Sequence, residues 1–150
     1  MKEYEINEET MAVIPMNYYQ TLIKETDNEY VINKRAYEIM ESSCEYYGST
    51  YKGRLTAAKK ILNSSYKIPI VIEESENIIF FPTKSSLLED CSWINYNFIK
   101  KYEKDGKNVK ITFKNNEQIS VDMSKLSLEN QISRSTKLEL TARKRKINKN

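Results

Sequence analysis

Residues 43–54 read Ser43-Cys44-Glu45-Tyr46-Tyr47-Gly48-Ser49-Thr50-Tyr51-Lys52-Gly53-Arg54 and hold two of the three glycines in the 150-residue chain. In so glycine-poor a protein, each glycine indicates a backbone position that a side chain would obstruct. The run predicts a joint between two helices, because Gly48 suits the end of one and Ser49 or Thr50 suits the N-cap of the next. Gly53 leaves the backbone beside Lys52 and Arg54 open to a polyanion. The alternative is an ordinary helical joint with solvated charges.

Helical periodicity extends to both sides of this joint. Asn33 is the expected cap of the first helix, whose apolar positions recur three and four residues apart: Ala36, Tyr37, Met40, Cys44 and Tyr47. The second helix is expected from about Tyr51 to Leu62. On it, apolar residues form one stripe and lysines project from another side.

The rest of the chain predicts short strands and a final helix. We expect strands at 10–14, 20–25, 29–32, 68–72, 78–82 and 93–102, then around Val109–Phe113 and Ile119–Val121. A helix is expected over 127–145, and the basic end, 143–150, is expected to fray. These elements predict an α+β fold in which an antiparallel sheet dominates, with two central helices and a C-terminal helix. Residues 1–150 are expected to form a single domain.

Composition excludes most enzyme classes. The chain has no histidine, which removes the commonest general base and the Ser-His and Cys-His nucleophile arrangements. Its two cysteines, Cys44 and Cys91, fit reduced and partly buried thiols, and without histidine they do not complete a zinc site. We therefore expect no enzyme, no metal and no cofactor. The sequence shows neither a membrane-spanning run nor a signal peptide, so we expect a cytoplasmic protein.

Charge is distributed unevenly along the chain. The overall net charge is +3, but residues 1–50 carry −6 and residues 124–150 carry +6. Such asymmetry indicates a polyanionic partner for the basic end. A solvated basic tail would give the same count.

Several short motifs follow one another in a fixed order along nearly the whole chain. They are residues 43–54 themselves, then Lys67-Ile68-Pro69-Ile70, Ile79-Phe80-Phe81-Pro82-Thr83-Lys84-Ser85-Ser86, Cys91-Ser92-Trp93-Ile94, Phe113-Lys114-Asn115 and Ser127-Leu128-Glu129-Asn130-Gln131-Ile132-Ser133-Arg134-Ser135. In this order and spacing the motifs resemble the competence transcription factor family, ComK. Two positions depart from the family pattern: Ser92 stands where a glycine often precedes the tryptophan, and Glu45 stands where a basic residue is common.

The resemblance implies a bacterial transcriptional activator of competence genes. It implies binding to paired AT-rich promoter boxes on double-stranded DNA, largely through the minor groove and as an oligomer, either a dimer or a tetramer. RNA polymerase is a candidate further partner, and the expected location is cytoplasmic and nucleoid-associated. Longer family members carry a C-terminal tail implicated in delivery to an adaptor and its protease. This chain stops at Asn150, so the resemblance leaves open whether an adaptor and its protease control this protein.

Narrow A-tract minor grooves have a strong negative potential that attracts inserted arginine and lysine. We expect Lys52 and Arg54 at the joint to contact DNA, with Lys59 and Lys60 as phosphate contacts on the following helix. A second candidate group consists of Arg134, Lys137, Arg143, Lys144, Arg145 and Lys146. Of this group, the family motif reaches only Arg134. For each lysine, a solvated surface charge is the alternative.

The sequence is also compatible with other functions. The main alternative is a competence-factor paralogue that acts as a protein-interaction module without strong DNA binding, and a second is an RNA-binding accessory protein. Tyr46, Tyr47 and Tyr51 are candidates for base stacking. However, Tyr47 and Tyr51 fall on apolar stripes, so we expect them in the core, together with Trp93.

Overall fold

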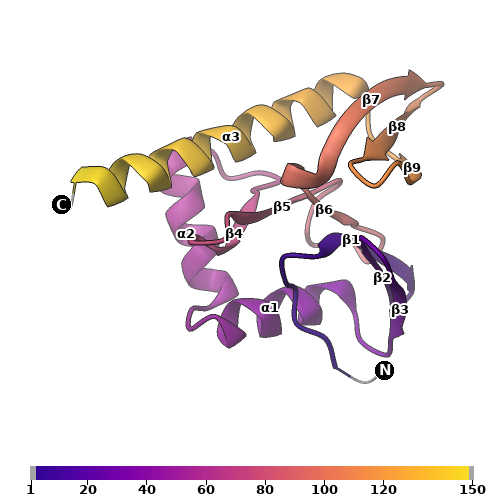
Figure 1. The fold of residues 1–150 in the computed structure, drawn as a ribbon, viewed down its shortest axis with the longest axis horizontal. Coiled ribbons are helices and arrows are strands. Elements are labelled where there is room, and N and C mark those ends of the chain that lie inside the picture. Colours follow the sequence, from indigo (N-terminus) through magenta and orange to yellow (C-terminus); the bar gives the residue numbers. More distant parts are fainter. Residues whose placement is uncertain (1–2, 149–150) are drawn as a thin grey trace.

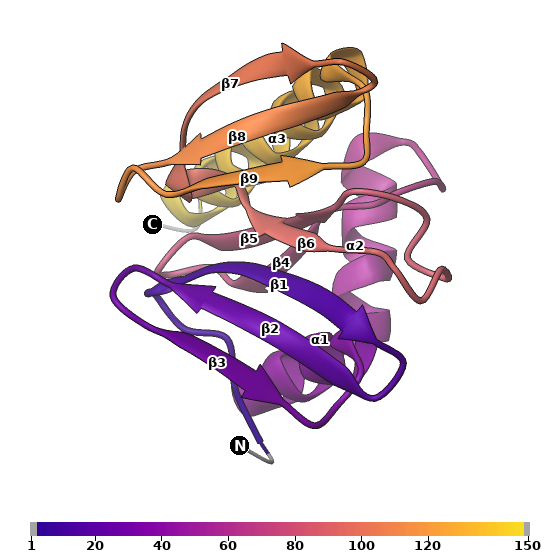
Figure 2. The same cartoon turned by 90° about the vertical axis from the view of Figure 1, so that its right-hand side faces the viewer.

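A computed structural model describes residues 3–148, in which six antiparallel strands form the larger of two sheets (Figures 1 and 2). The strand order is β3-β2-β1-β6-β5-β4. The strands are β1 (Thr10–Asn17), β2 (Gln20–Glu25), β3 (Glu29–Ile32), β4 (Ile70–Glu73), β5 (Ile78–Pro82) and β6 (Trp93–Asn95). Short turns connect the pairs β1–β2, β2–β3 and β4–β5. β6 joins the N-terminal strands to the β4–β5 hairpin by pairing with both β1 and β5.

The smaller sheet is a three-stranded antiparallel meander of β7 (Ile99–Asp105), β8 (Asn108–Phe113) and β9 (Gln118–Val121). Its two turns use residues with positive φ, Gly106 at 63° and Asn116 at 72°. Glycine and asparagine tolerate this left-handed conformation better than other residues, which explains their places in the sequence.

Three helices complete the described fold: α1 (Ala36–Tyr46), α2 (Tyr51–Leu62) and α3 (Lys125–Asn148). At the joint between α1 and α2, Gly48 has φ +84° and ends α1. The Thr50 side chain accepts a hydrogen bond from the Gly53 N–H at 2.9 Å, which caps α2. The predicted joint and the bounds of α2 are thus confirmed. Figure 1 shows α3 along one side of the molecule, with its first turns beside the small sheet and its later turns beside α2.

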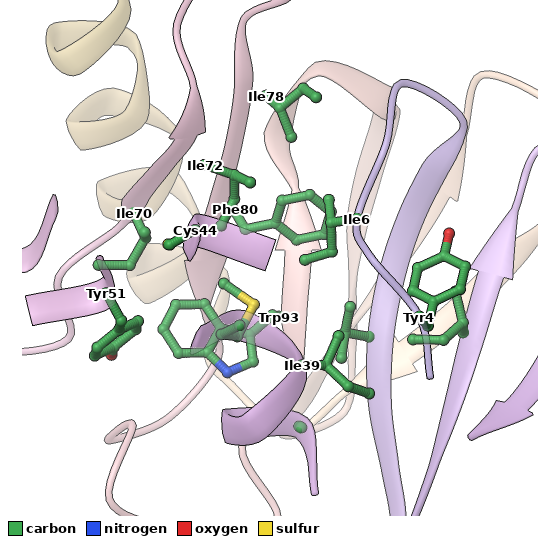
Figure 3. Close-up of a cluster of buried hydrophobic side chains, with 14 of the residues drawn as sticks. Tyr4, Ile6, Ile39, Cys44, Tyr51, Ile70, Ile72, Ile78, Phe80 and Trp93 are labelled. Carbon is green, nitrogen blue, oxygen red and sulfur yellow. The ribbon is translucent and has the colours of Figure 1, made fainter. Parts of the chain in front are cut away.

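The large sheet separates two cores because its side chains alternate between faces. Phe80 and Trp93 point into a core with α1, drawn in Figure 3, whereas Phe81 and Ile94 point into a core with the small sheet and α3. A third cluster fixes α2 against α3 through buried Ala58 and Leu138. The α+β fold, with antiparallel sheets and a C-terminal helix in one domain, agrees with the prediction.

Three predicted strands have other bounds in the structure, and the strand predicted over 68–72 is β4, Ile70–Glu73. β1 continues through Pro15 to Asn17, because β6 pairs with β1 only at Ala12 and Val13. Beyond those residues one side of β1 has no partner strand, and edge positions of this kind are where a sheet tolerates proline. The predicted strand over 93–102 is broken by a 3₁₀ turn, η1 (Tyr96–Phe98), that carries the chain from one sheet to the other. The Asn95 side chain starts this turn by accepting from the Asn97 N–H.

The predicted helix ends also need correction. Asn33 does not cap α1, because the helix begins at Ala36 and the Asn33 side chain instead accepts from Gln20. Glu38 accepts the backbone N–H of Arg35 at that end of the helix. α3 starts at Lys125 and continues to Asn148, through most of the segment predicted to fray. Fraying of 143–150 stays a prediction, and residues 149–150 lie outside the described residues.

Candidate nucleic-acid interface

The three lysines predicted on α2 project into solvent. Lys52 lies in the first turn of α2, and Lys59 and Lys60 lie in its last turn. Within residues 3–148, none of the three forms an ion pair. Their charges are therefore available to an external anion.

Arg54 is placed differently from its lysine neighbours. Its side chain is only 22% exposed, and its Nη1 lies 3.3 Å from the Glu74 Oε1. Its Nε is buried and has no hydrogen-bond partner in the described structure. Arg54 thus already pairs with a carboxylate, while its buried Nε–H donor is unused.

A groove of about 480 Å³ brings residues from distant parts of the chain together. It lies between α2, β4 and the later turns of α3, and has an apolar floor with charged groups around it. The lining consists of Arg54, Ala57, Ala58, Ile61, Val71, Glu74, Leu138, Ala142, Arg145 and Lys146. The structure therefore unites one predicted cation of the joint with two of the C-terminal cluster.

Arg134 has a structural role. Its guanidinium donates to the carbonyls of Tyr66 at 2.7 Å and Lys67 at 2.9 Å, and to Ser64 Oγ at 3.0 Å and Gln131 Oε1 at 2.9 Å. Burial lowers the pKa of the Arg134 guanidinium. These bonds hold the segment after α2 against α3. A DNA contact by Arg134 stays a prediction, because its donors are engaged within the protein.

The other predicted cations of α3 lie in three settings. Lys137 and Lys144 lie on an exposed face with Leu140, whereas Arg145 and Lys146 face the groove. Arg143 pairs with Glu139 at 2.5 Å. Helical geometry accounts for the split, since Lys137 and Lys144 lie within about 20° of each other around the helix and Lys146 lies about 160–180° from both. The same angular count on the sequence would have separated them.

Sequence reasoning missed Glu74 as a member of this site. Glu74 lies in the turn that connects β4 to β5. Only the packing of α2 against β4 brings Glu74 to Arg54, which is 20 residues away in the sequence.

The aromatic residues named in the sequence analysis differ in how far they are buried. Trp93 and Tyr51 are buried as expected, and the half-buried Tyr47 donates its hydroxyl to the Ile6 carbonyl at 2.9 Å. Tyr46 is 67% exposed. Tyr66, which sequence reasoning did not single out, is also exposed, in the segment that Arg134 holds. A run of polar residues around one tyrosine, Asn63-Ser64-Ser65-Tyr66, is a signal that was available in the sequence.

Both cysteines are buried and unpaired, in line with reduced thiols, and burial raises the pKa of each to about 11. Within residues 3–148, no three histidine, cysteine or acidic side chains are grouped to bind a metal ion. None of the helices in that range combines the length and apolarity needed to span a bilayer.

Comparison with known proteins gives the same family as the motifs. The sequence profile described as "ComK protein" matches residues 1–147. A protein named "Competence transcription factor" from Bacillus subtilis (strain 168) is 31% identical over 138 residues, which cover 89% of this chain and 72% of the relative. No solved structure matches the chain. A match to transcription factors also confirms the prediction that the protein is not an enzyme. The chain belongs to the ComK protein family.

Proposed function

We propose that this protein is a bacterial competence transcription regulator, an activator that binds AT-rich double-stranded DNA largely through the minor groove. Membership of the ComK family and the name of the Bacillus subtilis relative support the regulatory role. The observation that carries DNA binding is the packing of α2 against α3, which brings Arg54 together with Arg145 and Lys146 at one groove.

The charge arrangement supports contacts of two kinds. Lys52, Lys59 and Lys60 are exposed on α2, and Lys137 and Lys144 are exposed on α3. Exposed, unpaired lysines suit the phosphate backbone, which positions a protein without reading sequence. Arginines at the groove, Arg54 and Arg145, suit the minor groove, whose negative potential is strongest in A-tracts. Shape and deformability would then carry much of the sequence preference.

Assembly and further partners follow from the family resemblance. Paired promoter boxes suit an oligomer, because two copies of the chain on one duplex combine their phosphate contacts. We also infer RNA polymerase as a further partner and a cytoplasmic, nucleoid-associated location.

Fluorescence anisotropy with labelled duplexes tests the proposal. The protein is titrated against an AT-rich duplex and a GC-rich duplex of equal length, at salt concentrations from 50 to 200 mM. If about six phosphates are neutralised, affinity falls by about 10³-fold over that range. We expect tighter binding to the AT-rich duplex. Absence of binding at 50 mM salt, or a flat salt response, contradicts the proposal.

A competence-factor paralogue acting as a protein-interaction module is the second candidate. The specific observation in its favour is the loop before β6, where Leu87 is 92% exposed and Leu88 is 52% exposed. Exposed apolar side chains of this size are typical of protein-binding surfaces. Failure to bind either duplex, with the fold intact by circular dichroism, favours this candidate.

A further inference from the structure

The loop between α2 and β4, residues 63–69, presents an exposed tyrosine ring between the two predicted basic elements. Tyr66 is 62% exposed. The loop leaves the end of α2 at Asn63 and contacts α3 through Arg134. The loop thus connects the end of α2 to α3, the two elements that carry the exposed lysines.

The backbone of this loop is held rigidly. Arg134 donates to the carbonyls of Tyr66 and Lys67, and Gln131 Nε2 donates to the Lys67 carbonyl at 2.9 Å. Asn63 and Lys67 adopt left-handed backbone angles, with φ 50° and 51°. A loop fixed in this way presents Tyr66 without the entropy cost of ordering it on binding.

One lysine lies over the Tyr66 ring, and others lie on the two elements that the loop contacts. Lys67 Nζ lies 5.4 Å from the centroid of the Tyr66 ring. Lys59 and Lys60 occupy the last turn of α2, just before the loop, and Lys137 follows Arg134 by about one turn of α3. Phosphates held by these cations would bring the bases of a duplex close to the ring.

The other strongly exposed tyrosines lack these features. Tyr19 and Tyr46 are 74% and 67% exposed, but each packs edge-on against a neighbouring tyrosine, at 4.9 Å and 5.1 Å between ring centroids. Both lie in the first 50 residues, which carry a net charge of −6. Among residues 3–148, no other aromatic ring packs against Tyr66.

We propose that Tyr66 inserts its ring against the bases of the bound duplex as an apolar wedge. The inference rests on the DNA-binding function proposed above and adds a non-ionic contact to the cationic ones. Minor-groove proteins commonly place an apolar side chain at a base step and partly unstack it. AT-rich sequences offer flexible TA steps at which this deformation costs least.

The test compares Tyr66→Ala and Tyr66→Phe with the wild type by anisotropy on the AT-rich duplex, over the same salt series. Tyr46→Ala and Tyr19→Ala are matched controls that remove equally exposed rings. We expect Tyr66→Ala to bind about 10-fold more weakly at every salt concentration, because loss of a base–aromatic contact removes no phosphate contact. Tyr66→Phe should keep wild-type affinity, and both controls should bind within about 2-fold of the wild type.

Thermal unfolding of each variant shows whether the fold is kept, and we expect unchanged transitions because the ring is exposed. A Tyr66→Ala protein that binds like the wild type overturns the inference. So does a loss matched by either control. If the wild-type protein itself binds no duplex at 50 mM salt, the proposed function fails, which is a different result from an inert Tyr66.

Discussion

Arg54 and Glu74 form an ion pair at the groove between α2 and α3, with Arg54 Nη1 3.3 Å from Glu74 Oε1. Arg54 belongs to the helical joint, and Glu74 belongs to the turn after β4. In the DNA-free protein, a carboxylate therefore already neutralises the arginine predicted to contact DNA. A phosphate that approaches Arg54 competes with Glu74.

Replacing Glu74 with glutamine should strengthen DNA binding. The change frees the Arg54 guanidinium and keeps the size of the side chain. Because the pair is partly exposed, we expect a gain of about 3- to 5-fold in affinity for the AT-rich duplex, measured by anisotropy. Glu76→Gln is the matched control, since it removes the same charge from the same turn without touching Arg54. Equal gains in the two variants, or a full gain for Glu74→Gln in an Arg54→Ala background, would show that competition for Arg54 is absent.

Replacing Arg54 with alanine should weaken DNA binding and leave the fold intact. We expect about a 5- to 50-fold loss of affinity for the AT-rich duplex and a decrease of about 1 in the slope of log affinity against log salt. The thermal transition should shift only slightly, because the partner of Arg54, the Glu74 carboxylate, is 46% exposed and such ion pairs contribute little to stability. Arg35→Ala removes an exposed arginine from the acidic part of the chain and serves as the control. A lowered melting temperature with intact DNA affinity would make Arg54 a structural residue.

Replacing Arg134 with alanine should destabilise the protein. The change removes the hydrogen bonds that Arg134 donates to the carbonyls of Tyr66 and Lys67. It also removes those to the side chains of Ser64 and Gln131. We expect the free energy of unfolding in urea to fall by about 2–4 kcal/mol. Lys137→Ala, three residues along the same helix and exposed, should change that free energy by less than about 0.5 kcal/mol. Similar stabilities for both variants would contradict the structural role of Arg134.

Replacing Gly53 with alanine should not stabilise the protein, because the added side chain would disturb the N-cap of α2. A Cβ added at Gly53 would lie 2.9 Å from Thr50 Oγ1, the atom that accepts the Gly53 N–H. Glycine-to-alanine changes within helices normally stabilise by up to about 1 kcal/mol, but here the gain is offset by damage to the cap, itself worth about 1 kcal/mol. We therefore expect no increase in unfolding free energy for Gly53→Ala alone, and an increase when it is made in a Thr50→Gly background. An increase in the wild-type background would show that the contact relaxes freely.

The two thiols should be unreactive in the native protein. Burial raises the pKa of Cys44 and Cys91 to about 11, so both stay protonated at pH 8. Ellman's reagent at pH 8 should therefore label them slowly in the native protein and fully in denaturant. Since each folded-state pKa lies above the unfolded value, their contribution to stability is present below about pH 9 and is lost as the pH rises through 11. Rapid labelling of the folded protein would contradict this burial.

Local chemistry was enough to predict the helical joint. Gly48 ends α1 and Thr50 caps α2 because positive φ and side-chain capping depend on residues adjacent in the sequence. Strand breaks were harder to predict. The turn at Asn95 interrupts a run whose apolar alternation continues, and Pro15 is accepted only because one side of β1 has no partner strand there.

The sequence by itself determined the α+β class, the positions of the helical joint and most strands, and the family, since periodicity, turn residues and ordered motifs are local properties of the chain. Only the tertiary structure decided which charges act together. It placed Glu74 on Arg54, engaged Arg134 within the loop after α2, and turned Arg145 into the groove while Lys137 stayed outside. The physical reason is that charge partners are set by the packing of α2, α3 and β4, which joins residues far apart in the chain.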